Sequence, residues 1–335
     1  MRNSCSKPAF RAFGGKGLVK RAAVFDIGSV SVKMLVAEAK PEGGFIPLLE
    51  RMRVTRLAEG LAGRKEFLPE AVERTLEALA EFSAEAVALG ATELEALGTE
   101  ALRRVSNPGD FARRLFCRTG IPLEVIEPET EARLAFRSAV QLFPDREGPA
   151  CTLDVGGGST EILSGEKERL GPRALLPIGA LRLKEACIPA DPPGEAEISL
   201  MRGTVSKLVQ RHLMGLSCTR LVGMGGTVMV LASIQAGRPS FEPEKLHGTW
   251  LSRDSVDSLI LKLRGLPREE RMQIPGLPRD REDLALPGAV IVAEVLNALG
   301  LPGLVASAWG IRHGRMAERF GQAWKGENPC PPPSD

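Results

Sequence analysis

The chain has 335 residues, of which 43% are hydrophobic and 26% are charged, and its formal net charge is +2 at pH 7. This length exceeds a typical single compact core and predicts two domains, with room for a cleft between them. The nearly balanced charge argues against nucleic acid as the main partner. No apolar run approaches the roughly 18 residues of a membrane-spanning helix, and the cysteines contain no CxxC pair, so we expect a cytoplasmic protein with no membrane partner.

The two ends of the chain differ in composition from the rest. Residues 1–20 are basic and glycine-bearing and contain no acidic residue. We predict a flexible tail there, either a disordered leader or a segment that attracts a polyanion. Residues 324–335 include a proline-rich stretch and are also predicted to be loose.

The first part of the chain predicts a β-rich start followed by β–α units. Two apolar runs, AAVFDIGS and VSVKMLVAE, are separated by a glycine turn, which is typical of two tightly joined strands. Farther on, apolar residues recur at helical spacing from Pro69 until Gly90 ends the helix. Thr99 can cap a later helix by accepting a backbone N–H. We therefore expect strands and helices, in chain order, at 21–38 (two strands), 45–54, 69–90, 92–98, 99–107 and 111–117.

The same opening returns in the middle of the chain. ACTLDVGGGSTEILSG again gives an apolar strand, an aspartate, a glycine turn and a second strand. CTRLVGMGGTVMVLASI then predicts a strand, a glycine turn and a helix, and residues 252–299 are mostly helical in pattern with proline interruptions. The recurrence indicates a duplicated lobe.

The glycine run that follows Asp154 is the most specific candidate site. Gly156, Gly157 and Gly158 let backbone N–H groups approach an oxyanion that a Cβ would hold away, and Ser159 and Thr160 add hydroxyls. Asp154 offers an oxygen for a hard cation such as Mg²⁺, and Glu161 points to the same region. A plain hairpin turn is the alternative explanation for the glycines.

A shorter version of this loop occurs near the start of the chain. Asp26 precedes Gly28 and Ser29, and Lys33 stands in an otherwise apolar strand. A phosphate would provide a partner for the ammonium group of Lys33. The alternative is that Lys33 lies at a strand edge and extends to water.

A third glycine turn contains Gly225, Gly226 and Thr227. It follows a predicted strand and begins a predicted helix, so its amides and the helix dipole would face an anion or a nucleotide. A compact turn without a ligand explains the same pattern.

The order of these motifs resembles the exopolyphosphatase and guanosine-pentaphosphate phosphohydrolase family. The resemblance runs from about Arg21 to Phe320 and is that of a short member without the extra C-terminal domain. It rests on successive motifs: DIGSVSVKM, GTEALRR, ETEARL, LDVGGGSTEI, LPIGALRL, GMGGT, HGTWL and PGLPRDREDLALPGA.

The resemblance implies an α/β class with a duplicated actin-like fold, two lobes and an interlobe cleft. The lobes would span residues 21–130 and 131–323, with the last helix packing back on the first lobe. It also implies hydrolysis of inorganic polyphosphate or guanosine pentaphosphate with Mg²⁺ or Mn²⁺, and a homodimer.

The resemblance assigns roles to individual residues. Glu131 would be the base that activates water, and Arg103 the arginine that pairs with phosphate. Asp154, Asp26 and Glu161 would lie on the metal side, and Glu161 would also be catalytic. From the pattern alone, Glu131 is an exposed helical glutamate beside Arg133, and Arg103 and Arg104 are a solvated basic helix start.

The sequence departs from the family pattern near two of these residues. Val30 stands where most members have asparagine, which weakens the expected phosphate-chain binding. Glu127-Pro128 replaces serine-glycine and Thr130 replaces an acidic residue, so the loop before Glu131 is expected to take a different path. A polyphosphate- or nucleotide-sensing protein with weak or lost turnover, and an acceptor-specific kinase of the same fold, are therefore the alternative functions.

Overall fold

The computed structural model describes residues 20–59, 61, 64–142, 148–166, 169–188, 191–279 and 281–321. These residues form two compact units: one reaches Ala135 and resumes at Ile311, and the other spans Phe136–Gly310. The division between the units thus falls a few residues after the predicted boundary at 130. The predicted tails lie almost entirely outside the described residues. Within the described residues, no helix is both long and apolar enough to cross a membrane.

The first unit is built on a five-stranded mixed sheet in the order β3-β2-β1-β4-β5. β1, β2 and β3 form an antiparallel meander, while β4 runs parallel to β1 and β5 parallel to β4. All of these strands except the short β5 were predicted from the pattern. They span Arg21–Ile27, Ser31–Ala39, Phe45–Val54, Glu93–Gly98 and Leu123–Val125.

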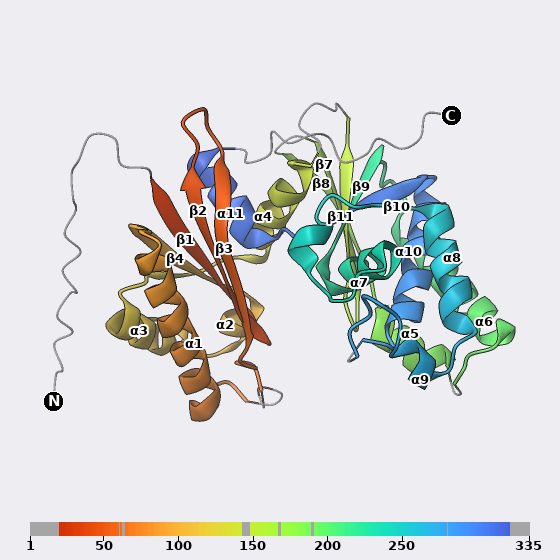
Figure 1. Cartoon of the computed structure of the whole chain (residues 1–335), viewed down its shortest axis with the longest axis horizontal. Coiled ribbons are helices and arrows are strands. Elements are labelled where there is room, and N and C mark those ends of the chain that lie inside the picture. The colour runs from red at the N-terminus through yellow and green to blue at the C-terminus, as the bar shows by residue number, and fades with distance from the viewer. Residues whose placement is uncertain are drawn as a thin grey trace. The chain divides into compact units, whose positions relative to one another are not determined.

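Helices cover both faces of this first sheet (Figure 1). Side chains alternate along a strand, so Phe25 of β1 packs with the helices α1 and α3 in one core. Glu50 of β3 lies on the opposite face, where it contacts Arg312 and His313 of α11. The helices of this unit are α1 (Pro69–Ala88), α2 (Glu100–Arg104), α3 (Pro108–Thr119), the first part of α4 (Pro128–Val140) and α11 (Ile311–Phe320).

The second unit contains a six-stranded mixed sheet in the order β10-β11-β9-β6-β7-β8. β6, β7 and β8 form an antiparallel meander, and β9 runs parallel to β6. The strands span Ala150–Val155, Thr160–Glu166, Arg169–Leu176, Arg220–Met224, Trp250–Ser252 and Gly303–Ser307 for β6 to β11.

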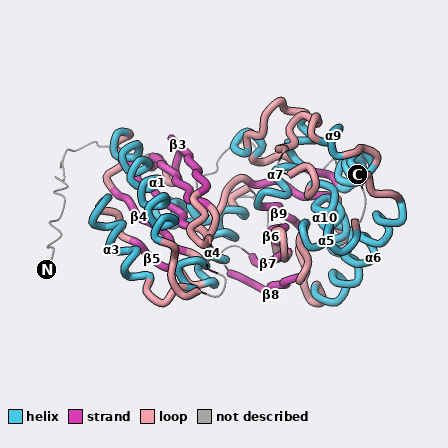
Figure 2. Tube along the Cα trace, turned by 90° about the horizontal axis from the view of Figure 1, so that it is seen from below, coloured by secondary structure: helices cyan, strands magenta, loops and turns pink. Residues whose placement is uncertain are grey.

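One large hydrophobic core joins this second sheet to its helices. Figures 1 and 2 both show α6 and α10 on the same side of β7 and β9. α10 is almost wholly buried because α5, α6, α7 and α8 all pack against it. The helices are α5 (Ala180–Cys187), α6 (Glu195–His212), α7 (Gly225–Ala236), the 3-10 turn η1 (Pro243–Leu246), α8 (Arg253–Arg264), α9 (Arg268–Arg271) and α10 (Ala285–Leu299).

The two sheets repeat one topology, as the duplicated sequence pattern predicted. In each unit an antiparallel meander of three strands is followed by a strand parallel to the first. A further parallel strand, β5 or β11, then extends the sheet beside that strand. Asp26 and Asp154 occupy equivalent places, each one residue before the end of the first strand of its meander.

One local prediction was wrong. Thr99 stands at the N-cap of α2, but its side chain makes no capping hydrogen bond. Its hydroxyl instead donates to the carbonyl oxygen of Ile27 at 3.3 Å, which ties the start of α2 to the end of β1. A hydrogen bond to a distant strand thus replaces the predicted capping hydrogen bond within the helix.

Candidate active site

The two glycine turns are closed by the same hydrogen bond. The N–H of Gly28 donates to the carbonyl oxygen of Ser31 at 3.1 Å, and the N–H of Gly156 donates to that of Ser159 at 2.9 Å. At both glycines a Cβ would come within about the same short distance of that oxygen, 3.2 and 3.1 Å. The duplicated pattern therefore extends to the atomic geometry of the turns.

The carbonyl groups of the second turn are held by the following helix. Gly156 O accepts from the N–H of Ala180 at 2.9 Å, and Gly157 O accepts from that of Arg182 at 3.0 Å. Gly179 has to be a glycine because a Cβ there would overlap the backbone of this turn. Gly157 and Gly158 are exposed, and within the described residues their own N–H groups have no hydrogen-bond partner. The turn therefore presents N–H groups from which a phosphate oxygen can accept hydrogen bonds.

The first turn is held in a similar way but carries side chains. The carbonyl of Val30 accepts from the N–H groups of Thr55 and Arg56 at 2.9 and 2.8 Å, and Ser29 O accepts from Ala58 N at 2.9 Å. Val30 takes the place that Gly158 has in the second turn, and the residue is 59% exposed. The departure noted at Val30 therefore puts a hydrocarbon on the surface of the turn.

Asp26 and Lys33 face each other on neighbouring strands. They are register partners of β1 and β2, and Asp26 Oδ2 lies 4.0 Å from Lys33 Nζ. Burial raises the pKa of Asp26, whereas the positive charges of Lys33 and Arg312 lower it. Because β2 lies between β1 and β3, Lys33 is not on an edge strand. Lys33 therefore has a carboxylate partner, and its side chain remains 40% exposed.

The structure brings Arg103 and Glu131 together although they are far apart in sequence. Arg103 Nη2 donates to Glu131 Oε2 at 2.9 Å, and Nη1 donates to the carbonyl oxygen of Ile126 at 2.6 Å. The side chains are 21% and 34% exposed, so the pair is partly screened from water but still reachable. Arg103 therefore orients the carboxylate of Glu131, and its contact with phosphate stays a prediction.

The departure at Pro128 is accommodated at the start of α4. Pro128 is the first residue of this helix, a position where the missing N–H costs nothing because it would have no partner inside the helix. Glu131 lies in the first turn, and its N–H donates to Glu127 O at 2.9 Å. The proline thus begins the helix that carries the predicted base.

Two carboxylates of the second unit lie on one face of the sheet. Asp154 and Glu161 are direct register partners on β6 and β7, and both residues are exposed. Glu161 Oε2 also accepts from Arg173 Nη2 at 2.9 Å, a partner that sequence reasoning missed. Arg173 lies two residues along β8 from Leu175, the register partner of Glu161, so strand alternation is the signal that could have found it.

These carboxylates suit Mg²⁺ better than a metal that needs a full protein cage. The described residues contain no group of three or more His, Cys, Asp or Glu side chains able to hold a metal. Mg²⁺ commonly uses one or two carboxylates and takes its other ligands from phosphate and water. Asp154 and Glu161 would hold such an ion, while Asp26, beside Lys33, is less suited.

The third glycine turn begins α7 and lies against Asp154. Gly225 has a φ of +77°, and a Cβ there would overlap the carboxylate of Asp154, so glycine makes room for that side chain. At Gly226, Nη1 of Arg281 lies 2.9 Å from the position of a Cβ. Arg281 is a cation at this turn that sequence reasoning did not assign. The two residues are distant in the chain, and only the fold brings them together.

Two predicted phosphate-binding hydroxyls have partners inside the fold. Thr160 is fully buried and its hydroxyl donates to Ile178 O at 2.8 Å. The Thr227 hydroxyl donates to Val155 O at 2.7 Å, joining α7 to β6. Both side chains thus fix the shape of the glycine turns, and direct phosphate contact by either stays a prediction.

Three arginines of the first unit pair with acidic side chains. Arg113 pairs with Asp110, Arg114 with Glu73 and Arg133 with Glu318. Arg104 pairs with Glu100 one helical turn away, as expected of a solvated helix start. Arg182 differs, because its Nη1 donates to Pro177 O and its Nη2 lies 3.9 Å from the position of a Cβ at Gly158.

Solved structures with this architecture define the class of protein. The crystal structure of the type II variant of the Aquifex aeolicus Ppx/GppA phosphatase has a TM-score of 0.81 and 30% identity, covering 89% of this chain and 99% of that one. An exopolyphosphatase from Cytophaga hutchinsonii has a TM-score of 0.71 and 25% identity, covering 92% and 100%. The chain is an α/β protein of the two-lobed actin-like fold.

The sequence comparisons identify the family. The Ppx/GppA phosphatase family matches residues 35–322, so the chain belongs to this family. Exopolyphosphatase 1 of Mycobacterium tuberculosis is 28% identical over 304 residues, which cover 90% of this chain and 88% of the relative. Exopolyphosphatase 2 of the same organism is 29% identical over 290 residues, covering 83% and 91%.

Proposed function

We propose that this protein is a phosphoanhydride hydrolase that releases terminal orthophosphate from inorganic polyphosphate. The observation that carries the proposal is the pair formed by Arg103 and Glu131, in which a partly buried carboxylate is oriented by an arginine that is itself fixed to Ile126 O. The names of the two M. tuberculosis relatives support polyphosphate as the substrate.

In the proposed reaction, water attacks the terminal phosphorus while Glu131 takes a proton from it. A new P–O bond forms to the water oxygen, the bond to the bridging oxygen breaks, and the shortened chain leaves with the bonding electrons. General-base catalysis of this kind contributes roughly 10²- to 10⁴-fold in rate.

The remaining groups stabilise charge. The exposed N–H groups of Gly157 and Gly158 donate to phosphate oxygens, and Lys33 supplies a positive charge beside the first turn. A divalent cation held by Asp154 and Glu161 would neutralise further phosphate charge. Each of these tasks is compatible with the position of the group in its own unit.

The direct test is orthophosphate release from long-chain polyphosphate, guanosine pentaphosphate and ATP in the presence of Mg²⁺, with wild type and Glu131→Gln. Glu129→Gln is the matched control, because Glu129 lies in the same first turn of α4 and is exposed. We expect Glu131→Gln to lower kcat roughly 10²- to 10⁴-fold and Glu129→Gln to leave it nearly unchanged.

The substrate comparison also separates the alternatives. Tight polyphosphate binding without orthophosphate release in the wild type would contradict a hydrolase and favour a sensing protein. Phosphate appearing on an acceptor and not in solution would favour a kinase.

A further inference from the structure

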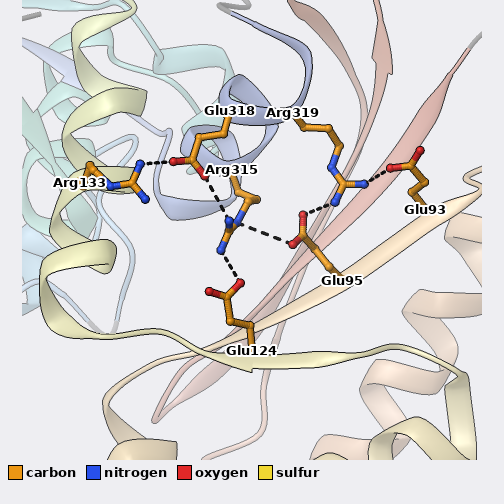
Figure 3. Close-up of polar contacts among 7 residues, drawn as sticks. All are labelled: Glu93, Glu95, Glu124, Arg133, Arg315, Glu318 and Arg319. Atoms are coloured by element: carbon orange, nitrogen blue, oxygen red, sulfur yellow. Dashed lines mark hydrogen bonds and ion pairs between the residues drawn. The ribbon is translucent and has the colours of Figure 1, made fainter. Parts of the chain in front are cut away.

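Charged side chains of α11 join α4 to the first sheet in one ion-pair network (Figure 3). All of its members belong to the first unit. Arg133 comes from α4, and acidic partners come from β4 and β5. The members are Glu93, Glu95, Glu124, Arg133, Arg315, Glu318 and Arg319.

Glu318 is the link between α4 and the rest of this network. Its Oε1 accepts from Arg133 of α4, and its Oε2 accepts from Nη1 of Arg315 at 3.2 Å. Arg315 in turn lies 2.7 Å from Glu124 and 3.7 Å from Glu95. A continuous series of ion pairs therefore runs from α4 through Glu318 to two strands of the sheet.

The central ion pair of this series is partly buried. The side chains of Glu318 and Arg315 are only 19% and 18% exposed. Ion pairs that are partly buried are screened less by water and salt than exposed ones. They therefore hold a fixed geometry more firmly than the surface pairs of α1 and α3.

The backbones of α4 and α11 also approach each other closely. A Cβ at Gly314 of α11 would overlap the carbonyl oxygen of Leu134 in α4. α4 is thus held at Arg133 and Leu134, two and three residues after Glu131 in the chain. Arg103 holds the carboxylate of Glu131 from the other direction, through Nη2.

We propose that Glu318 is a positioning residue for Glu131. By joining Arg133 to Arg315 it fixes the first turns of α4, and therefore the carboxylate of the base, on the first unit. This inference rests on the proposed function of Glu131. It assigns a role in the reaction to a residue that lies far from Glu131 in sequence.

The test compares Glu318→Gln with Arg319→Gln. Arg319 lies on the same helix and pairs with Glu93 and Glu95, but it does not contact α4 through any of these pairs. We expect Glu318→Gln to lower kcat for polyphosphate roughly tenfold with little change in KM, because small displacements of a catalytic group are costly. Arg319→Gln should lower the melting temperature by about as much as Glu318→Gln does, but it should leave kcat unchanged. Glu318→Asp should recover part of kcat.

A double variant asks whether Glu318 acts through Glu131. In the Glu131→Gln background, Glu318→Gln should have no further effect on the residual kcat, because the base is already absent. Equal losses of kcat in Glu318→Gln and Arg319→Gln, or full additivity in the double variant, would overturn the inference and leave only a structural role.

The same experiment keeps the two proposals apart. If Glu131→Gln abolishes turnover while Glu318→Gln matches the wild type in kcat, the positioning role fails and the proposed function stands. If the wild type releases no orthophosphate from any substrate, the proposed function fails and the positioning role fails with it.

Discussion

Equivalent positions in the two hairpins carry opposite charges. Lys33 stands opposite Asp26 in the first unit, and Glu161 stands opposite Asp154 in the second. The first pair combines a cation with an anion, which suits contact with a phosphate. The second combines two anions, which suits a divalent cation shared with phosphate. Lys33 and Glu161 thus occupy equivalent positions in the duplicated fold with opposite charges.

Sequence patterns predicted the residues of the glycine turns but not their partners. Asp154 and Gly156 to Gly158 could be recognised because their chemistry depends on neighbours in the chain. Arg281 could not, because tertiary packing decides which arginine lies beside Gly226. Arg173 could have been found only by combining strand alternation with the register of β7 and β8. The pairing of Arg103 with Glu131 likewise depends on the fold.

A buried histidine predicts how the stability of the first unit depends on pH. Burial lowers the pKa of His313, the charges of Arg312 and Lys33 lower it further, and the hydrogen bond with Glu50 raises it. The folded pKa therefore lies below the unfolded value of about 6.5. The stability that neutral His313 contributes is fully present above pH 6.5 and is lost as the pH falls from there towards the folded pKa. For one proton, the free energy of unfolding decreases by at most about 1.4 kcal/mol per pH unit.

Urea unfolding between pH 7.5 and 5.5 checks this prediction. The urea concentration at the unfolding midpoint should decrease as the pH is lowered in the wild type. It should decrease less steeply in His313→Gln. Identical slopes in the two proteins would show that His313 does not titrate with unfolding in this range.

At the scale of elements, α11 extends the first unit with residues from near the end of the described chain. Arg312 Nη1 donates to Met34 O of β2 at 2.7 Å, and Phe320 O accepts from Gly44 N at 2.6 Å. Helical spacing could not foretell which sheet this helix would join. The resemblance led us to expect that the last helix packs on the first lobe, and the division into units groups α11 there.

The close approach of α11 to α4 predicts that Gly314 tolerates no side chain. Gly314→Ala should destabilise the protein by about 1–3 kcal/mol, because the added methyl group overlaps the backbone of Leu134 and forces the helices apart. Gly203→Ala in α6 is the matched control, since nothing lies within 4 Å of a Cβ there. That variant should gain about 0.5–1 kcal/mol from helix propensity. A stabilising Gly314→Ala in thermal or urea unfolding would contradict the packing described.

At the scale of the whole molecule, the sequence predicted the duplication and most elements of the first unit, but it did not predict β8, α5, α6 or β11 of the second unit. Long periodic segments such as Pro69–Ala88 were predictable because their apolar stripe is local. The short strands β5 and β10 were not predicted, because each has only three residues and is defined by its pairing with a neighbour. The residues at which the chain passes between the units depend on tertiary contacts, and both the predicted boundary at 130 and the division after Ala135 lie within α4.

The most direct test of the central claim is hydrolysis of long-chain polyphosphate by the wild-type protein with Mg²⁺ in ¹⁸O-labelled water. Attack of water on the terminal phosphorus predicts that each newly released orthophosphate contains one ¹⁸O atom and that chains shorten from their ends. Glu131→Gln should slow this release. Absence of labelled orthophosphate, or transfer of unlabelled phosphate to an acceptor, would contradict the proposed hydrolase.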